Sequence, residues 1–208
     1  TRVNASYGSA TNLPSHYQEK MNIYYEQTSL KPERSKNIEL GLNNKFEEVN
    51  IEFKIYKSKV KDSFDWRDGY YFNNNTVDIT GAELSLETKI LGWDLNTNID
   101  YNKSVDRVNN KQKGRRPNRS ISLNLSKASG KWKRNINWTA HSRAWDRSDH
   151  TTGQIGGYGL LNLSTSYDFT EDLSVYLNRN NVLDKDYEMA KGYNTLGKTT
   201  MIGLTYNF

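Results

Sequence analysis

Few side chains in this chain of 208 residues are of a type that could carry out acid–base or metal chemistry. Cysteine is absent, which excludes disulfide frameworks and cysteine-ligated zinc, and the histidines are His16, His141 and His150. Asp146, Asp149 and His150 are close in sequence, and an acid–base pair or a metal site could be built from them. Because no catalytic motif accompanies them, we expect no enzyme, no cofactor and no metal.

A basic segment is the second feature with a chemical meaning. Its cations fall between residues 107 and 119, where no acid occurs, and such a patch attracts phosphate groups. They are Arg107, Lys111, Lys113, Arg115, Arg116 and Arg119. Nucleic-acid binding is the other use of a basic patch, but no recognition motif or helix accompanies these charges.

Three aspartates of one loop form a weaker candidate. Asp62, Asp65 and Asp68 could offer carboxylate oxygens, which are ligands that calcium prefers. Their spacing matches no recognised calcium loop, so we assign no metal ligand to them.

The composition limits the class of protein. Apolar residues make up 35% of the chain, aromatic residues 12%, the net charge is +5 and the mean hydropathy is −0.90. The chain is too polar for a thick soluble core and too aromatic for intrinsic disorder. It has no run of about 18 apolar residues that could form a transmembrane helix, and no signal peptide at its start.

Alternating apolar and polar residues supply the elements that would position these groups. Every odd residue from Val49 to Ile55 is apolar, and so is every even residue from Ile202 to Phe208. Successive side chains of a strand point to opposite faces, so each segment has one apolar and one mainly polar face. The pattern predicts ten strands, near residues 2–9, 35–44, 49–60, 76–89, 91–103, 118–128, 132–142, 159–169, 173–182 and 198–208.

One predicted strand changes phase. Val77 and Ile79 are odd, whereas Ala82, Leu84 and Leu86 are even. An extra residue in the strand would restore the register, and glycine in a strand often marks such a bulge. The sequence therefore predicts a β-bulge at residue 81.

The connections between the strands alternate in length. We expect short turns at residues 45–48, 90, 129–131 and 170–172, and long loops at residues 10–34, 61–75, 104–117, 143–158 and 183–197. Transmembrane barrels have short periplasmic turns, long extracellular loops and strands of about 9–11 residues. Aromatic residues near strand ends suit the membrane interfaces. We therefore predict an all-β fold, an antiparallel transmembrane β-barrel; a soluble barrel or sandwich explains the alternation but not the polar inner faces.

Several motifs are similar to those of a known family. They are Tyr7-Gly8, Leu30-Lys31-Pro32-Glu33-Arg34-Ser35, Glu39-Leu40-Gly41, Ile79-Thr80-Gly81-Ala82-Glu83-Leu84, Arg115-Arg116-Pro117, the run 181–188 and the terminal Phe208. Together they resemble the C-terminal part of the barrel of TonB-dependent outer-membrane receptors, over essentially the whole chain. The run 185–188, with residues 192–195 and 197–198, is most like the cobalamin (vitamin B12) receptors, and some siderophore receptors share it. The chain departs from the family at Val182-Leu183, where Leu-Phe is usual, and at Gln27-Thr28-Ser29, where Asn-Pro is often found.

The resemblance implies a barrel of about twenty-two strands in the bacterial outer membrane, an N-terminal plug and a segment that binds the energy-coupling protein TonB. We interpret residues 1–208 as the C-terminal part of that barrel, without the plug and the N-terminal strands. The implied function is active uptake of a scarce large ligand, cobalamin first and a ferric siderophore or haem second. Two other classes stay open: a free-standing ten-stranded outer-membrane protease and a passive porin-like channel.

The barrel interpretation gives the candidate residues their roles. Aromatic and arginine side chains in the loops suit a large planar or amphipathic ligand. These are Trp66, Tyr70, Tyr71, Phe72, Arg143, Trp145, Tyr158 and Tyr193. On an extracellular loop the phosphates within reach of the basic segment belong to lipopolysaccharide, and outer-membrane lipid surrounds the strands. By resemblance, Phe208 with Tyr206 forms the signal read by the barrel assembly machinery.

Overall fold

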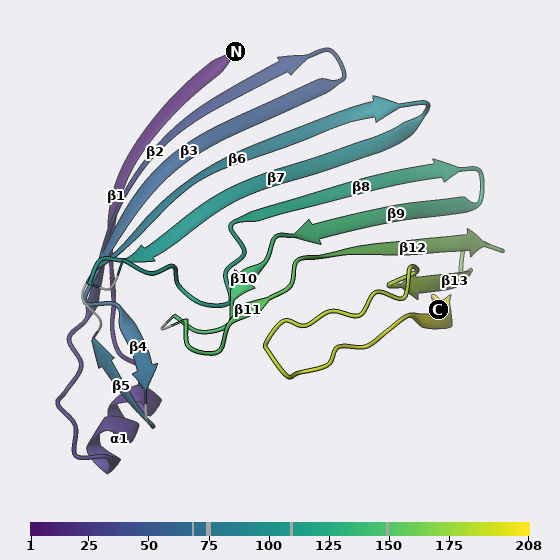
Figure 1. Ribbon diagram of the computed structural model, residues 1–208. Helices are drawn as coiled ribbons and strands as arrows, with labels where there is room; N and C mark the ends of the chain where they lie inside the picture. Colours follow the sequence, from purple (N-terminus) through teal and green to yellow (C-terminus); the bar gives the residue numbers. More distant parts are fainter. Residues whose placement is uncertain (68, 74–75, 109, 149) are drawn as a thin grey trace.

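The computed structural model describes residues 1–67, 69–73, 76–108, 110–148 and 150–208. Its main element is one antiparallel sheet of ten strands, each paired with the next along the chain (Figure 1). The strands are β1 (Arg2–Asn12), β2 (Glu33–Phe46), β3 (Val49–Lys61), β6 (Thr76–Ile90), β7 (Trp93–Asp106), β8 (Arg119–Ser129), β9 (Trp132–His141), β12 (Tyr158–Asp168), β13 (Leu173–Asn180) and β14 (Thr199–Tyr206). Each overlaps one predicted strand, so the all-β prediction is confirmed.

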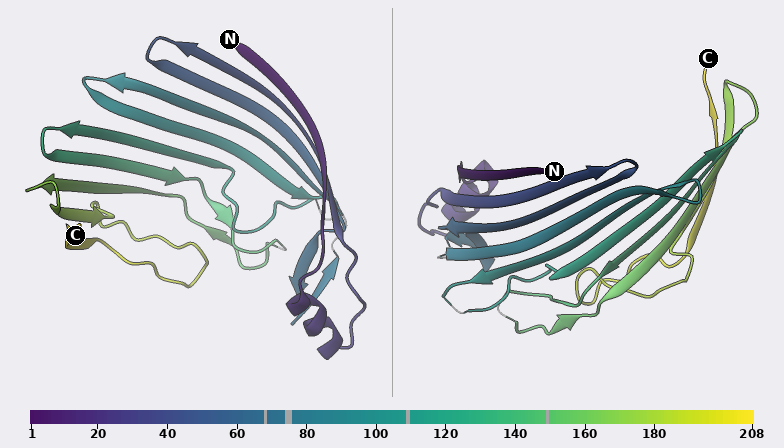
Figure 2. Two further views of the ribbon diagram at one scale, coloured as in Figure 1. Left: turned by 180° about the vertical axis from the view of Figure 1, so that it is seen from behind. Right: turned by 90° about the horizontal axis from the view of Figure 1, so that it is seen from above.

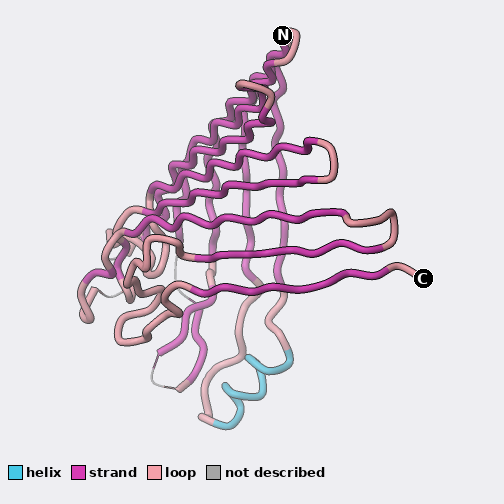
Figure 3. The backbone as a smooth tube through the Cα atoms, turned by 90° about the vertical axis from the view of Figure 1, so that its right-hand side faces the viewer, coloured by secondary structure: helices cyan, strands magenta, loops and turns pink. Residues whose placement is uncertain are grey.

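The connections sort onto the two ends of the sheet as predicted. Short turns join β2 to β3, β6 to β7, β8 to β9 and β12 to β13, and long loops join the other neighbours. Figure 3 shows the loops gathered at one end and the turns at the other, with both chain termini on the turn side. In a transmembrane barrel the short turns lie in the periplasm and the long loops outside the cell.

The sheet is curved like a section of a cylinder wall (Figure 2). Within the described residues it is open, with β1 and β14 as its two edges. An open edge in lipid would leave backbone N–H and C=O groups without partners. The curvature and the two edges are those of an arc of a larger barrel, while the number of twenty-two strands stays a prediction.

The two faces of the sheet differ in chemistry. The outer face is defined by the apolar residues of each strand, for example the cross-strand row Leu40, Ile55, Ala82 and Tyr101. The inner face carries charged and amide side chains, including a Lys54–Glu52 ion pair of 3.0 Å. The buried apolar residues of the described chain are few: Leu30, Val77, Leu95, Ala144 and Ile155. So small a core, with exposed apolar residues on one face, is typical of transmembrane barrels, whose apolar band faces lipid.

The predicted bulge at Gly81 is wrong. The pairing of β6 with β3 and β7 runs one to one through Gly81, opposite Tyr56 and Asn102. The change of phase has another cause. Val77 lies on the inner face near the loops, where it is only 3% exposed, opposite Val60. At the loop end of these strands Val77 and Val60 lie on the inner face, whereas the apolar residues of β6 nearer the turn lie on the outer face.

The loop end holds elements that the sequence pattern did not predict. They are helix α1 (His16–Tyr24) and two hairpins, β4 (Phe64–Arg67) with β5 (Tyr70–Asn73) and β10 (Ala144–Trp145) with β11 (Gln154–Ile155). Ser15 caps α1 through a reciprocal pair of hydrogen bonds with Gln18. In the described part of the chain, no helix is long and apolar enough to cross a membrane.

Candidate functional site

Amide side chains fix the first part of the extracellular rim, which consists of α1 and the β4–β5 hairpin (Figure 1). The Asn22 side chain, 2% exposed, donates to the Tyr71 carbonyl at 2.8 Å and accepts from the Tyr71 amide at 2.9 Å. The Asn73 side chain accepts from the Lys31 amide at 2.7 Å and donates to the Asp62 carbonyl at 2.7 Å. The Asn22 bonds join the helix to the hairpin, and the Asn73 bonds join the hairpin to the chain segments on either side of β2 and β3.

A single carboxylate joins three loops in the second part of the rim. Asp146, 7% exposed, accepts from Arg115 Nε at 3.0 Å, from the Lys191 amide at 3.1 Å and from Thr152 Oγ1 at 3.1 Å. These partners come from the loops β7–β8, β13–β14 and β9–β12. The three loops therefore share one electrostatic anchor.

The electrostatic environment keeps this anchor ionised. The hydrogen bond from the Lys191 amide, with those from Arg115 and Thr152, holds the pKa of the Asp146 carboxyl below its usual value, although burial acts in the opposite direction. The backbones of two of these loops also come close together at Gly114. A Cβ added to this residue would lie 2.7 Å from the Arg147 carbonyl carbon. Only glycine lets the two loops come this close.

The acid and the histidine of the suspected catalytic cluster have separate partners. The His150 ring stacks on Trp145, with 4.0 Å between ring centroids, and its Nε2 lies 2.8 Å from the Gln112 carbonyl. Asp146 is engaged by the three loops, and Asp149 lies outside the described residues. The described geometry gives no support to a protease at the rim: Asp146 is hydrogen-bonded to the loops, and His150 packs against Trp145.

The eight predicted ligand residues fall into two groups. Trp66, Tyr70, Tyr71 and Phe72 lie on the β4–β5 hairpin, while Arg143, Trp145, Tyr158 and Tyr193 lie on or next to the loops around Asp146. Several are engaged within the rim: Tyr71 with Tyr17, Tyr70 with Phe72, Trp145 with His150 and Tyr158 with Tyr187. Trp66 (52%) and Tyr193 (72%) are exposed, and Arg143 is also exposed.

A half-buried ion pair between Lys113 and Asp65 links the β4–β5 hairpin to the loops around Asp146. Lys113 Nζ lies 2.7 Å from Asp65 Oδ2, with the two side chains 12% and 26% exposed. Asp65 also accepts from the Trp66 amide at 3.0 Å. Asp62 and Asp65 are described, Asp68 lies outside the described residues, and the described residues contain no group of three His, Cys, Asp or Glu side chains that could hold a metal.

The basic segment is partly neutralised by acids of the same protein. Arg107 Nε donates to Asp78 at 2.6 Å, Lys113 pairs with Asp65 and Arg115 with Asp146. Arg116 donates to Ser104 Oγ at 3.3 Å. Lys113 and Arg115 thus hold loops together, whereas Arg107 follows the end of β7 and pairs with β6. That the six cations bind lipopolysaccharide stays a prediction, and the sequence did not reveal these acid partners, which come from distant segments.

A second set of cations was missed by the sequence reasoning. On β3 the outer face changes from the apolar residues 49–55 to Lys57, Lys59 and Lys61. The strand register places further cations of β2, β7 and β8 on the same face. The outer cation belt comprises Arg34, Lys36, Lys57, Lys59, Lys61, Lys103, Arg107 and Arg119, which are all exposed. The lysines at every second residue of β3 were the signal in the sequence.

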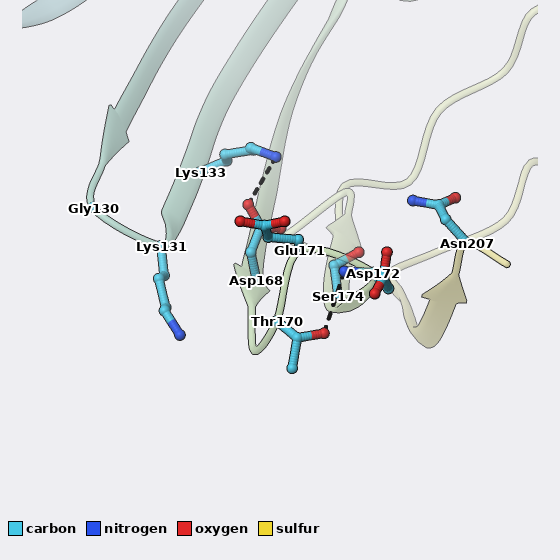
Figure 4. Close-up of a pocket in the computed structure, with 9 residues that line it drawn as sticks. All are labelled: Gly130, Lys131, Lys133, Asp168, Thr170, Glu171, Asp172, Ser174 and Asn207. Atoms are coloured by element: carbon cyan, nitrogen blue, oxygen red, sulfur yellow. Dashed lines mark hydrogen bonds and ion pairs between the residues drawn. The ribbon is translucent and has the colours of Figure 1, made fainter.

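The turn end carries a polar pocket of about 530 Å³, shown in Figure 4. Lys133 Nζ pairs with Asp168 at 2.9 Å, and Lys131 Nζ donates to the Phe169 carbonyl at 2.8 Å. Asn207, from the last residues of the chain, also lines it. Beyond it, the Phe208 ring meets Tyr206 edge-on, with 5.1 Å between centroids. The polar groups of this pocket tie neighbouring turns together.

Comparison with known proteins identifies a family model and a relative that match this chain. A family model described as TonB dependent receptor-like, beta-barrel matches residues 1–182. The vitamin B12 transporter BtuB of Photobacterium profundum is 27% identical over 191 residues, which is 86% of this chain and 31% of that protein. The chain therefore spans less than a third of the length of this relative.

Solved structures share the fold. The copper transporter OprC has a TM-score of 0.81 and 18% identity, covering 99% of this chain and 37% of that one. The ferric-catecholate import receptor Fiu from E. coli K12 has a TM-score of 0.76 and 17% identity, covering 99% and 33%. The FrpB iron transporter from Neisseria meningitidis has a TM-score of 0.78 and 16% identity, covering 99% and 36%. Since the family model spans most of this chain, the chain belongs to the TonB-dependent receptor-like β-barrel family, a family of the bacterial outer membrane.

Proposed function

We propose that this chain forms wall and extracellular rim of a receptor that actively takes up a scarce, large ligand, with cobalamin as the first choice. The observation that carries this choice is the 27% identity to a vitamin B12 transporter over 86% of the chain. The rim supplies exposed aromatic and cationic side chains, which suit a large planar ligand. The chain supplies no chemical step in this proposal.

The anchored loops support capture of a ligand. Asp146 and the Lys113–Asp65 pair hold the loops in one arrangement before binding. Rigid loops lose less conformational entropy when a ligand binds, and this lowers the cost of association. The exposed Trp66, Arg143 and Tyr193 are the contacts that we propose, and the other five predicted residues position them.

A ferric siderophore or haem is the second choice. Structural neighbours include receptors named for ferric catecholates and for ferripyoverdine. Their identities to this chain, 17% and 18%, support the shared fold rather than a shared ligand. We propose TonB as the energy source on the basis of the family, acting through a region outside residues 1–208.

Calorimetry on the intact receptor tests the ligand. We expect cyanocobalamin to bind, and Arg143→Ala or Tyr193→Ala to weaken binding about tenfold. Tyr7→Ala, an exposed aromatic of the outer face, serves as the matched control and leaves the affinity unchanged. Failure to bind at micromolar cobalamin, together with tight binding of a ferric siderophore, would replace the first choice by the second. Loss of uptake in cells without TonB, with binding retained, tests the energy source.

We also propose that the outer cation belt contacts phosphates of lipopolysaccharide. The belt lies on the lipid side at the loop end, and its acid neighbour Asp78 is paired with Arg107. We expect Lys57→Gln/Lys59→Gln/Lys61→Gln to lose co-purifying lipopolysaccharide, measured by native mass spectrometry of the intact receptor. Lys54→Gln, on the inner face of the same strand, is the control. Equal retention in both variants would count against the belt.

A further inference from the structure

The outer face also has a groove near its turn end, at the opposite end of the strands from the cation belt. The groove has a volume of about 400 Å³ and lies over β9, β12 and β13. Trp132, Tyr167 and Phe169 form its aromatic wall, and Val175 and Leu177 contribute aliphatic surface. The Trp132 and Tyr167 rings are 4.8 Å apart and the Tyr167 and Phe169 rings 4.9 Å apart. Its apolar lining is suited to a hydrocarbon chain.

Two cations lie beside this groove on the same face. Lys127 of β8 and Arg134 of β9 are direct cross-strand partners, and Arg134 is in turn opposite Thr165, which lines the groove. Each cation lies over a tryptophan ring. Lys127 Nζ is 5.9 Å from the centroid of Trp93, and the Arg134 guanidinium carbon is 5.4 Å from that of Trp132.

The pair is an unusual arrangement for this face. Like charges directly opposite one another in a sheet are destabilising, and a cation on the lipid face costs more free energy the deeper it lies. The neighbouring outer-face positions of the described strands are uncharged: Trp93, Leu95, Leu125, Ser129, Trp132, Ile136 and Thr165. The charge of the pair is therefore not offset by a carboxylate of this sheet face.

The side chains are directed toward the membrane boundary. Lys127 Nζ lies 3.4 Å from the carbonyl oxygen of Leu91, which belongs to the β6–β7 turn. Arg134 reaches back over Trp132, which is the first residue of β9 after its turn. Long cationic side chains bend in this way to place their charge at the level of the headgroups. An anionic group at that level would meet two cations, and a chain attached to it would meet the groove.

We propose that Lys127, Arg134 and the aromatic groove form a site for an anionic phospholipid of the periplasmic leaflet. The phosphodiester accepts hydrogen bonds from the ammonium and guanidinium groups, and one acyl chain occupies the groove. Basic pockets on transmembrane proteins recognise lipid headgroups by the same charge complementarity. The site requires that the barrel lies in a bilayer, and it is independent of which ligand the receptor transports.

Native mass spectrometry of the intact receptor in detergent tests this site. The probes are phosphatidylglycerol and phosphatidylcholine with identical acyl chains, added at equal concentration. We expect phosphatidylglycerol to be retained preferentially. We expect Lys127→Gln/Arg134→Gln to lose that preference, by about fivefold for each cation removed. Inorganic phosphate at the same concentration should not displace the lipid, because it lacks the chain that fills the groove.

Two variants keep the result interpretable. Arg179→Gln removes a cation from the same face of β13, away from the pair, and should leave the preference unchanged. Thr165→Phe fills the groove while both cations stay, and should weaken retention of both lipids. Equal retention of the two lipids by the unmodified receptor would overturn the proposal whether or not the variants fold. So would an unchanged preference in the folded double variant.

Discussion

The Tyr56 side chain lies across Gly81 on the inner face of the sheet, and its hydroxyl accepts a hydrogen bond of 2.7 Å from Asn102 on the next strand but one. A Cβ on residue 81 would come within 2.4 Å of the tyrosine ring and 2.7 Å of the Tyr101 carbonyl oxygen. Tyr176 lies over Gly203 in the same way between β13 and β14. Glycine in these strands makes room for a tyrosine, as in other sheets where an aromatic ring covers a cross-strand glycine.

Gly81→Ala should destabilise the intact receptor by about 1–3 kcal/mol, because the new methyl group overpacks a site that includes rigid backbone. Gly159→Ala is the matched control, since the nearest atom to an added Cβ there is 3.4 Å away. The measurement is the midpoint temperature at which each variant loses the gel mobility of the folded barrel. Equal midpoints for the two variants would contradict the packing role.

Gly203→Ala should be rescued by a second change, unlike Gly81→Ala. The three nearest atoms to its added Cβ all belong to the Tyr176 side chain. Tyr176→Ala removes them, so the double variant should be more stable than additivity of the single changes predicts. In the Gly81→Ala variant, adding Tyr56→Ala should recover less of the lost stability, because the Tyr101 carbonyl oxygen stays close to the new methyl group. A double-mutant cycle on each pair measures the difference.

Asp146→Asn should loosen three loops together. The change removes the charge that binds Arg115 and leaves a buried hydrogen-bond network incomplete, at a local cost of about 1–3 kcal/mol. Hydrogen exchange should rise in residues 110–118, 142–148 and 185–198, with the strands unaffected. Asp184→Asn is the control, because its pair with Lys198 is half-exposed and lies within one loop. Faster exchange in only one of the three segments would refute the shared anchor.

Acid should release the same anchor. The pKa of Asp146 is lowered in the folded protein, so its contribution is present above the unfolded pKa of about 3.9 and is lost as the pH falls through the folded value. Exchange in residues 142–148, corrected for the intrinsic rate, should rise below about pH 4 and should be independent of pH in Asp146→Asn. Residues 185–198 are a poorer reporter, because the pKa of Asp184 is also lowered there, by the Lys198 amide.

Deletion of Phe208 should lower the amount of receptor assembled in the outer membrane. The residue is fully exposed at the turn end, next to Tyr206 of the last strand, so its removal costs little packing within the sheet. A loss of surface receptor therefore reports on assembly. Unchanged surface levels of the receptor, measured by antibody labelling of intact cells, would contradict a role of Phe208 in assembly.

The strands were predictable because their signal is local. The apolar face of β3, from Val49 to Ile55, depends only on residues two apart, and each two-residue step returns to the same face. The alternation of short turns and long loops followed from the same pattern. Helix α1 was missed because its sequence carries little apolar periodicity; polar contacts such as Asn22 with Tyr71 hold it in place.

The contacts between segments depended on tertiary structure. Arg115 and Asp146 are 31 residues apart, and Lys113 and Asp65 are 48 apart, so no local sequence pattern predicts either pair. The sequence by itself determined the strands, their two faces and the family resemblance, because these depend on neighbouring residues. Only the register and the curvature of the sheet decided which cations are neutralised within the rim. They also decided which cations lie side by side on the outer face, since both bring distant residues within the few ångströms over which charges pair.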